Sequence, residues 1–138
     1  MNAFIIAPVL FPLLMGLLTM AMWRQKKLQE IVNLSGAFLH MLISFGILYL
    51  VLNQGIQVVQ IGGWEAPFGI SFVADTFSAI MVVLSGIISF SVALYSLSYM
   101  LKSKTEDDML KGQFQFGYYP LLNIIFMGIN GAFLTGDI

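Results

Sequence analysis

The 138-residue chain contains no cysteine. Disulfide bonds, thiolate metal sites and iron–sulfur clusters held by this chain are therefore excluded. Charged residues are also scarce, at 9% of the sequence, where about 25% is usual in a soluble domain. Hydrophobic residues make up 59%, which is more apolar surface than a soluble core of this size can bury. The composition therefore indicates an integral membrane protein.

The sequence also has no surplus of positive charge, since its net charge is -1. A nucleic-acid-binding face needs clustered basic residues, so nucleic acid is not an expected partner. The chain shows no nucleophile–base pair, phosphate-binding loop, zinc-ligand spacing or dinucleotide motif. We therefore expect no cofactor, no metal site and no enzymatic activity from this chain alone.

The basic residues are confined to two short segments, and long uncharged stretches separate them. A lysine or arginine costs about 2.5 to 3.5 kcal/mol at the centre of a membrane helix, so these segments mark where the chain leaves the lipid. With four spans, both segments lie on one side of the membrane. The positive-inside rule then places loops 23–30 and 102–113 in the cytoplasm, with the N-terminus and the loop near residues 55–72 outside.

The uncharged stretches predict four membrane helices, because one crossing takes about 20 residues. No basic residue precedes the first helix, which is therefore expected to be retained rather than cleaved as a signal peptide. Pro8 and Pro12 lie inside this helix, and we expect neighbouring helices to cover the carbonyl groups that they free. The predicted helices cover about residues 3–22, 31–52, 76–101 and 116–135.

Between the second and third helices the sequence predicts a short β-hairpin, at about residues 55–72, on the outer face. Phe68, Ile70 and Phe72 alternate with small residues, which is the period-two pattern of a half-buried strand. Gly62 and Gly63 supply the turn. The predicted fold class is thus an all-α integral membrane bundle with one short hairpin outside the cytoplasm.

The few polar side chains near the predicted helices are the candidates for an ion pathway. His40 lies near the middle of the second helix, either as a neutral hydrogen-bond partner or as a proton relay. Asn123 and Asn130 share one face of the fourth helix, where they bond to other helices or contact internal water. Asp75 and Asp137 lie at outer helix ends. Asp75 either caps the third helix or attracts cations to a pore mouth.

Four serines fall close to one line along the third helix, because their spacings of 7, 4 and 7 residues approximate whole helical turns. Small residues of this kind let another helix approach closely, and the alternative is a hydrated path. The four are Ser78, Ser85, Ser89 and Ser96.

Several segments carry a resemblance to the antiporter-like membrane subunits, which include the large subunits of Mrp-type multisubunit Na⁺/H⁺ antiporters and the proton-pumping subunits of respiratory complex I. The first two segments are common to these subunits, and the later ones resemble the D subunit of the Mrp complexes. The segments are Gly62-Gly63-Trp64-Glu65-Ala66-Pro67-Phe68-Gly69-Ile70, Ala74-Asp75-Thr76-Phe77-Ser78-Ala79-Ile80-Met81, Tyr95-Ser96-Leu97-Ser98-Tyr99-Met100, and residues 117–123 and 131–137.

The resemblance implies a subunit of about fourteen membrane helices, of which this chain is the N-terminal four. The sequence stops at Ile138 without a polar tail, so we expect the native chain to be longer. In the family, ion movement depends on a glutamate in the fifth helix and on lysines in later helices, none of which is present here. Asp137 would lie at the entrance to that fifth helix.

The function implied by this resemblance is exchange of cytoplasmic Na⁺ for external H⁺ in the bacterial cell membrane. The implied partners are other Mrp-type antiporter subunits and membrane lipid. Two alternatives remain open. The chain could belong to a proton-pumping subunit of complex I or of a membrane-bound hydrogenase, or it could be a non-catalytic four-helix assembly subunit.

Overall fold

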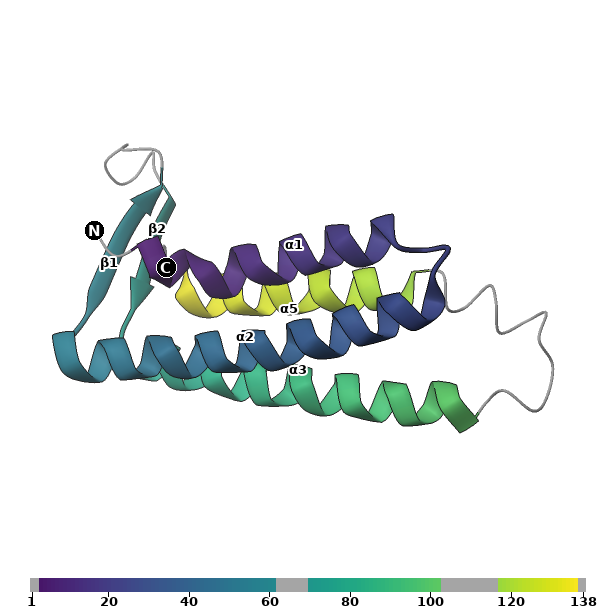
Figure 1. The fold of residues 1–138 in the computed structure, drawn as a ribbon. Coiled ribbons are helices and arrows are strands. Elements are labelled where there is room, and N and C mark those ends of the chain that lie inside the picture. Colours follow the sequence, from purple (N-terminus) through teal and green to yellow (C-terminus); the bar gives the residue numbers. More distant parts are fainter. Residues whose placement is uncertain (1–2, 62–69, 103–116, 137–138) are drawn as a thin grey trace.

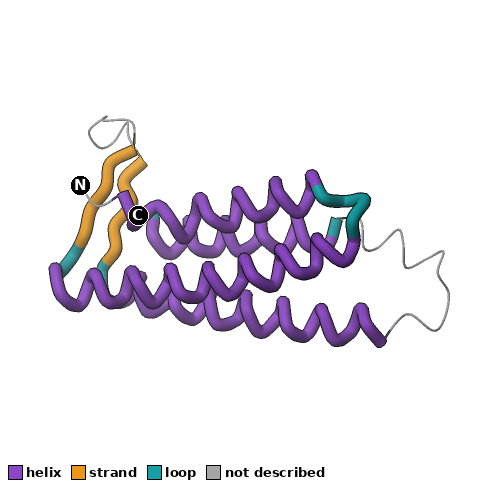
Figure 2. The backbone as a smooth tube through the Cα atoms, viewed as in Figure 1, coloured by secondary structure: helices purple, strands orange, loops and turns teal. Residues whose placement is uncertain are grey.

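The computed structural model describes residues 3–61, 70–102 and 117–136. In this part of the chain, long helices run alternately in opposite directions, and a two-stranded antiparallel sheet lies at one end of them (Figure 1). Figure 2 shows the strands at this end only. The elements are the 3₁₀ turn η1 (Ala3–Ile6), α1 (Ala7–Ala21), α2 (Lys26–Gln54), β1 (Gln57–Ile61), β2 (Ile70–Ala74), α3 (Thr76–Lys102) and α5 (Tyr118–Leu134).

The helices form two pairs, α1 against α5 and α2 against α3, and the pairs pack on each other (Figure 1). η1 and the end of α5 lie beside the strands, and we call this the hairpin end. The turn at residues 22–25 and the end of α3 lie at the opposite end, which we call the basic end because Arg24, Lys26 and Lys27 are there.

The apolar core lies where the hairpin closes the bundle. Val59 of β1 pairs directly with Phe72 of β2, and both side chains are buried. The chain after α5 also joins the sheet, because Thr135 forms a bridge with Phe72 and the Gly136 N–H donates to the Ser71 carbonyl at 2.9 Å. This contact fixes the end of α5 to β2. The core residues are Ile5, Ile47, Val51, Val59, Phe72, Ala74, Ala79, Val82 and Leu134.

The second helix begins earlier than the apolar pattern predicts, at Lys26 rather than near residue 31. Its first turn packs against the end of α1, where Gln29 is buried and its Nε2 donates to the Thr19 carbonyl at 2.8 Å. That carbonyl lies in the last turn of α1, where carbonyl groups have no partner within the helix. The apolar pattern marks the length of a helix inside lipid, whereas the helix itself extends beyond it.

The second strand also differs from its predicted position, since β2 continues to Ala74 rather than ending near Phe72. The predicted turn at Gly62 and Gly63, and the predicted start at Phe68, lie outside the described residues. α2 ends at Gln54, and the next residue, Gly55, has a φ of 76°, a backbone conformation that other residues rarely adopt. This glycine lets the chain leave the helix and enter β1.

The outer surface of the bundle is largely apolar, with Leu14, Met20 and Leu52 each more than half exposed. Within the described residues, three stretches are long and apolar enough to cross a membrane, and α5 is apolar but shorter, at 17 residues. The stretches are Phe4–Ala21, Lys26–Gln54 and Thr76–Leu97. The protein is therefore built as a multi-pass membrane protein.

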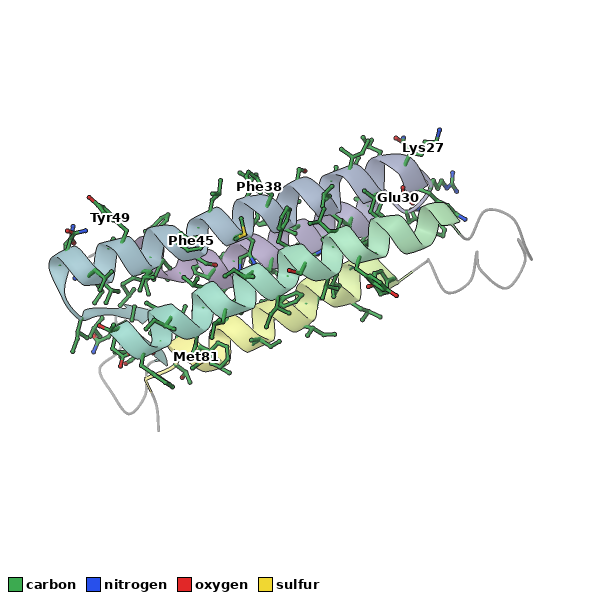
Figure 3. The ribbon with its side chains drawn as sticks, turned by 90° about the horizontal axis from the view of Figure 1, so that it is seen from below. Lys27, Glu30, Phe38, Phe45, Tyr49 and Met81 are labelled. Carbon is green, nitrogen blue, oxygen red and sulfur yellow. The ribbon has the colours of Figure 1, made fainter. Side chains whose placement is uncertain are left out.

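The side chains of α2 illustrate how the surface changes along the bundle (Figure 3). Lys27 and Glu30 lie near the basic end, and Tyr49 lies toward the hairpin end. Phe38 and Phe45, which are both exposed, lie between them. This order matches the layers of a bilayer. Charged groups lie at one end of α2, apolar side chains lie in the middle, and an amphipathic ring lies at the other end.

Candidate functional site: a buried polar cluster

A cluster of polar groups lies at the centre of the bundle, and every long helix contributes to it. His40 is at the midpoint of α2, Ser85 is on α3, Asn130 is on α5, and the carbonyl of Pro8 is on α1. The three polar side chains are nearly inaccessible, since His40 is 2% exposed, Ser85 4% and Asn130 0%. We call these four groups the central cluster.

The side-chain amide of Asn130 connects the other three groups. Its Oδ1 accepts a hydrogen bond from the Ser85 hydroxyl at 2.5 Å. Its Nδ2 lies 3.2 Å from the Pro8 carbonyl oxygen and 2.9 Å from Nε2 of His40. One amide group therefore links α5 to each of the other three long helices.

The Pro8 carbonyl fixes the orientation of this amide. A carbonyl oxygen only accepts hydrogen bonds, so the nitrogen of the Asn130 amide must face it. The same nitrogen lies 2.9 Å from Nε2 of His40, and it donates to Nε2 when that ring nitrogen carries no proton. In that tautomer a neutral His40 has its ring proton on Nδ1.

The central cluster is closed, with its hydrogen bonds made inside the protein. No buried side-chain nitrogen or oxygen in the described part of the chain lacks a partner. The backbone near His40 is also occupied, because the Ser44 hydroxyl donates to the His40 carbonyl at 2.9 Å. This arrangement joins helices and presents no set of free ligands to an ion.

A second polar contact lies toward the basic end. Nδ2 of Asn123 donates to Oδ1 of Asn33 on α2 at 2.9 Å and to the carbonyl of Tyr119 in its own helix at 2.8 Å. Nearby, the Ser96 hydroxyl lies 3.5 Å from the Tyr119 hydroxyl. Asn123 is partly buried, and its side-chain hydrogen bonds join α5 to α2.

The serine stripe of α3 is buried in helix contacts. Ser85, Ser89 and Ser96 are each about 95% buried, and Ser85 and Ser96 bond to α5. Beside the stripe, Gly86 lets α2 approach closely, because a Cβ at this position would lie 2.8 Å from the Ser44 hydroxyl oxygen. The stripe therefore acts as a packing face, as small residues commonly do in membrane helices.

Asp75 lies at the start of α3, outside the apolar stretch. Its Oδ1 accepts a hydrogen bond from the Ser78 N–H at 2.7 Å, which is the geometry of a helix N-cap. Hydrogen bonds from the Ser78 hydroxyl and the Ser78 N–H hold the pKa of Asp75 below its ordinary value. Asp137, the other carboxylate predicted at an outer helix end, lies outside the described residues.

The sequence points to His40, Asn123 and Asn130, and the structure brings two of them together. It places Asn123 in a separate contact, with Asn33 as a partner that the sequence analysis missed. The Pro8 carbonyl was also missed as a specific partner, although Pro12 four residues later signals that a donor is absent there. Among the described residues, no group of three or more His, Cys, Asp or Glu side chains could hold a metal ion.

Apolar helices joined by buried, neutral hydrogen bonds define a membrane-protein bundle, and comparisons with known proteins show what it is similar to. Residues 59–108 match the family model described as NADH-Ubiquinone oxidoreductase (complex I), chain 5 N-terminus. The chain is 36% identical to the D subunit of the Na⁺/H⁺ antiporter of Bacillus subtilis and 33% identical to that of Alkalihalophilus pseudofirmus. Both alignments cover 100% of this chain and 26% of the relative.

The fold has a solved counterpart in the membrane-bound sulfane sulfur reductase, an archaeal respiratory membrane complex. The TM-score is 0.80 at 22% sequence identity, over 96% of this chain and 26% of that chain. This likeness concerns the fold. The resemblance predicted from the sequence is confirmed, because the whole chain is similar to the N-terminal part of the antiporter D subunits. The chain spans 26% of the length of those relatives.

Proposed function

We propose that these helices form the N-terminal part of a membrane subunit of a multisubunit cation/proton antiporter. The whole subunit exchanges cytoplasmic Na⁺ for external H⁺ in the bacterial cell membrane, together with other antiporter subunits and in contact with lipid. The observation that carries this proposal is the alignment of all 138 residues with an antiporter D subunit at 36% identity. The apolar outer surface of the bundle supports a place in lipid.

Within that subunit, this segment acts as a scaffold rather than as the ion path. Residues 4–21, 31–54, 76–97 and 118–134 contain no Asp, Glu, Lys or Arg. His40 and Asn130 have their hydrogen bonds inside the bundle, and so does Asn123. Groups that carry ions across a membrane need free ligands or a water-filled path. Asp137 is the remaining candidate for contact with the ion path.

The bundle spans the membrane four times, with the hairpin end outside and the basic end in the cytoplasm. With 17 residues at about 1.5 Å each, α5 measures roughly 25 Å, which is near the lower limit for a crossing. It lies alongside α1 in Figure 1, so the two share one depth in the membrane. The positive-inside rule supports the orientation.

Two glutamines at opposite ends allow the orientation to be tested. Gln60 on β1 and Gln25 in the turn before α2 are both exposed, and the chain contains no cysteine of its own. In intact cells, a membrane-impermeant thiol reagent should label the subunit with Q60C and should miss the subunit with Q25C until the membrane is opened. Labelling of Q25C alone in intact cells would reverse the orientation, and labelling of both would contradict opposite placement of the two ends.

The transport activity is tested with the complete subunit and its partner subunits in cells that lack other Na⁺/H⁺ antiporters. Inside-out vesicles are energised to build a pH gradient, and Na⁺ is then added. The gradient should collapse partly in vesicles with the whole complex and should persist in matched vesicles that lack this subunit alone. An unchanged gradient in both would contradict the antiporter proposal.

A second candidate is a proton-pumping subunit of a redox-driven complex. The match to a complex I family model and the fold shared with a respiratory membrane complex favour it. The two candidates differ in what drives proton movement. In the redox-driven case, adding an electron donor to vesicles would create a gradient that depends on this subunit, and the purified complex would contain subunits with redox cofactors.

A further inference from the structure

Pro12 leaves a carbonyl group without its usual partner inside α1. In an α-helix each backbone N–H bonds to the carbonyl four residues earlier, and proline has no N–H. The Pro8 carbonyl therefore has no donor from residue 12. Both prolines are buried in the bundle, where water does not replace the missing bond, and an unpaired carbonyl in a membrane is costly.

Asn130 provides a donor to this carbonyl, from 122 residues further along the chain. We infer that the Asn130 amide replaces the backbone N–H that Pro12 removes, so that α1 depends on α5 to complete its own hydrogen bonding. Asn130 is then a positioning residue for the proline-containing part of α1. The interaction is distinct from ordinary contact between helices, because it compensates a defect that one residue introduces in another helix.

The surroundings of Asn130 explain why an amide serves this purpose. An amide has two N–H donors and one acceptor oxygen, and all three have partners in the central cluster. Turning the amide over would place its oxygen against the Pro8 carbonyl oxygen, and two acceptors repel each other. Leucine has a similar size and supplies no donor, so N130L removes the Asn130 hydrogen bond to the Pro8 carbonyl.

The inference predicts that the effects of changing Pro12 and Asn130 are not additive. P12V has a similar volume and restores the N–H at residue 12, which then bonds to the Pro8 carbonyl. N130L should lower the apparent Tm of the complete subunit in its natural complex by about 2 °C. In the P12V background the loss should be roughly half as large, because the carbonyl keeps a partner while Ser85 and His40 still lose theirs.

Two matched controls separate this effect from a general benefit of removing proline. P8V adds an N–H in the first turn of α1 and supplies no donor to the Pro8 carbonyl, so it should leave the loss caused by N130L unchanged. N123L removes the other asparagine on the same face of α5, whose amide donates to α2 and to its own helix rather than to α1. Its effect should be the same with and without P12V.

The measurement is thermal stability of the assembled complex in detergent, which does not depend on transport. An equal loss from N130L with Pro12 and with P12V would overturn the inference, and so would equal rescue by P8V. P12A supplies the same N–H with a smaller side chain, and it should reproduce the rescue if P12V disturbs packing. Failure of both variants to reduce the loss, while each alone assembles normally, would also overturn it.

Discussion

Asn130 and Asn123 lie seven residues apart on one face of α5, yet they occupy different environments. Asn130 is fully buried and links α5 to α1, α2 and α3. Asn123 is partly buried and bonds to one other helix and to the preceding turn of its own. Two identical residues at equivalent positions on a helix thus differ in how many partners depend on them.

The difference arises from the bundle around α5. At Asn130 the bundle is closed on all sides, and a proline in α1 has removed a backbone donor. At Asn123 the situation differs, because the Tyr119 carbonyl lies inside α5, where the helix backbone supplies a donor. The Asn123 amide adds a second hydrogen bond to that carbonyl. The cost of losing an amide in a membrane therefore depends on whether the groups that it bonds to can find other hydrogen-bond partners. Such hydrogen bonds are worth little on average, because other partners are commonly available.

The largest effect is expected from bulk placed inside the central cluster. S85L should reduce the stability of the assembled subunit by about 3 kcal/mol, because it overpacks a buried contact and removes the partner of Asn130. S91L is the matched control, since Ser91 is exposed and its hydroxyl bonds to its own helix at Ile87. Thermal unfolding of the two variants compares them, and equal losses would remove the basis for treating the serine stripe as a contact face.

The two asparagines themselves provide the direct comparison. N130L should cost about 2 kcal/mol, because it removes the amide that bonds to Ser85, His40 and the Pro8 carbonyl. N123L should cost about 0.6 kcal/mol, the average for a hydrogen bond between membrane helices. Both variants are measured as the yield of assembled complex and its apparent Tm. A larger loss from N123L would show that the contact near the basic end dominates.

The sequence predicts the helical membrane class, the hairpin and the small-residue face of α3, because these depend on local patterns. The apolar stretch 76–101, for example, nearly coincides with α3, where Asp75 and Thr76 mark the start. The early start of α2 was not predicted, since it depends on a contact between Gln29 and Thr19. The partners of Asn123 and Asn130 depend on helix pairing, which a pattern within one helix does not reveal.

His40 tests whether the central cluster is structural or carries protons. H40Q keeps an acceptor for Nδ2 of Asn130, whereas H40L removes it at a cost of about 1 kcal/mol. We expect H40Q to retain Na⁺-dependent pH change in vesicles, normalised to assembled complex, and H40L to lower mainly the amount assembled, by about fivefold. Loss of normalised transport in H40Q would make His40 part of a proton path.

A small effect is also expected at Asp75, far from both asparagines. D75A removes the N-cap of α3 and should cost about 1 kcal/mol, whereas D75N keeps a good capping residue and should cost less. The alternative role, attraction of cations to a pore mouth, predicts an equal loss of transport in both variants, because both remove the negative charge. In that case D75N would raise the Na⁺ concentration needed for half-maximal transport without a change in stability.

The pH dependence of stability separates the two roles of Asp75 further. Because hydrogen bonds from Ser78 lower the pKa of Asp75 in the folded protein, folding favours the ionised form. The cap therefore contributes fully above the ordinary Asp pKa of 3.8, and its contribution declines as the pH falls through the lowered value. The apparent Tm should accordingly fall less on acidification in D75N than in the unchanged protein. Parallel Tm curves for the two would show that the carboxylate does not stabilise α3 through its charge.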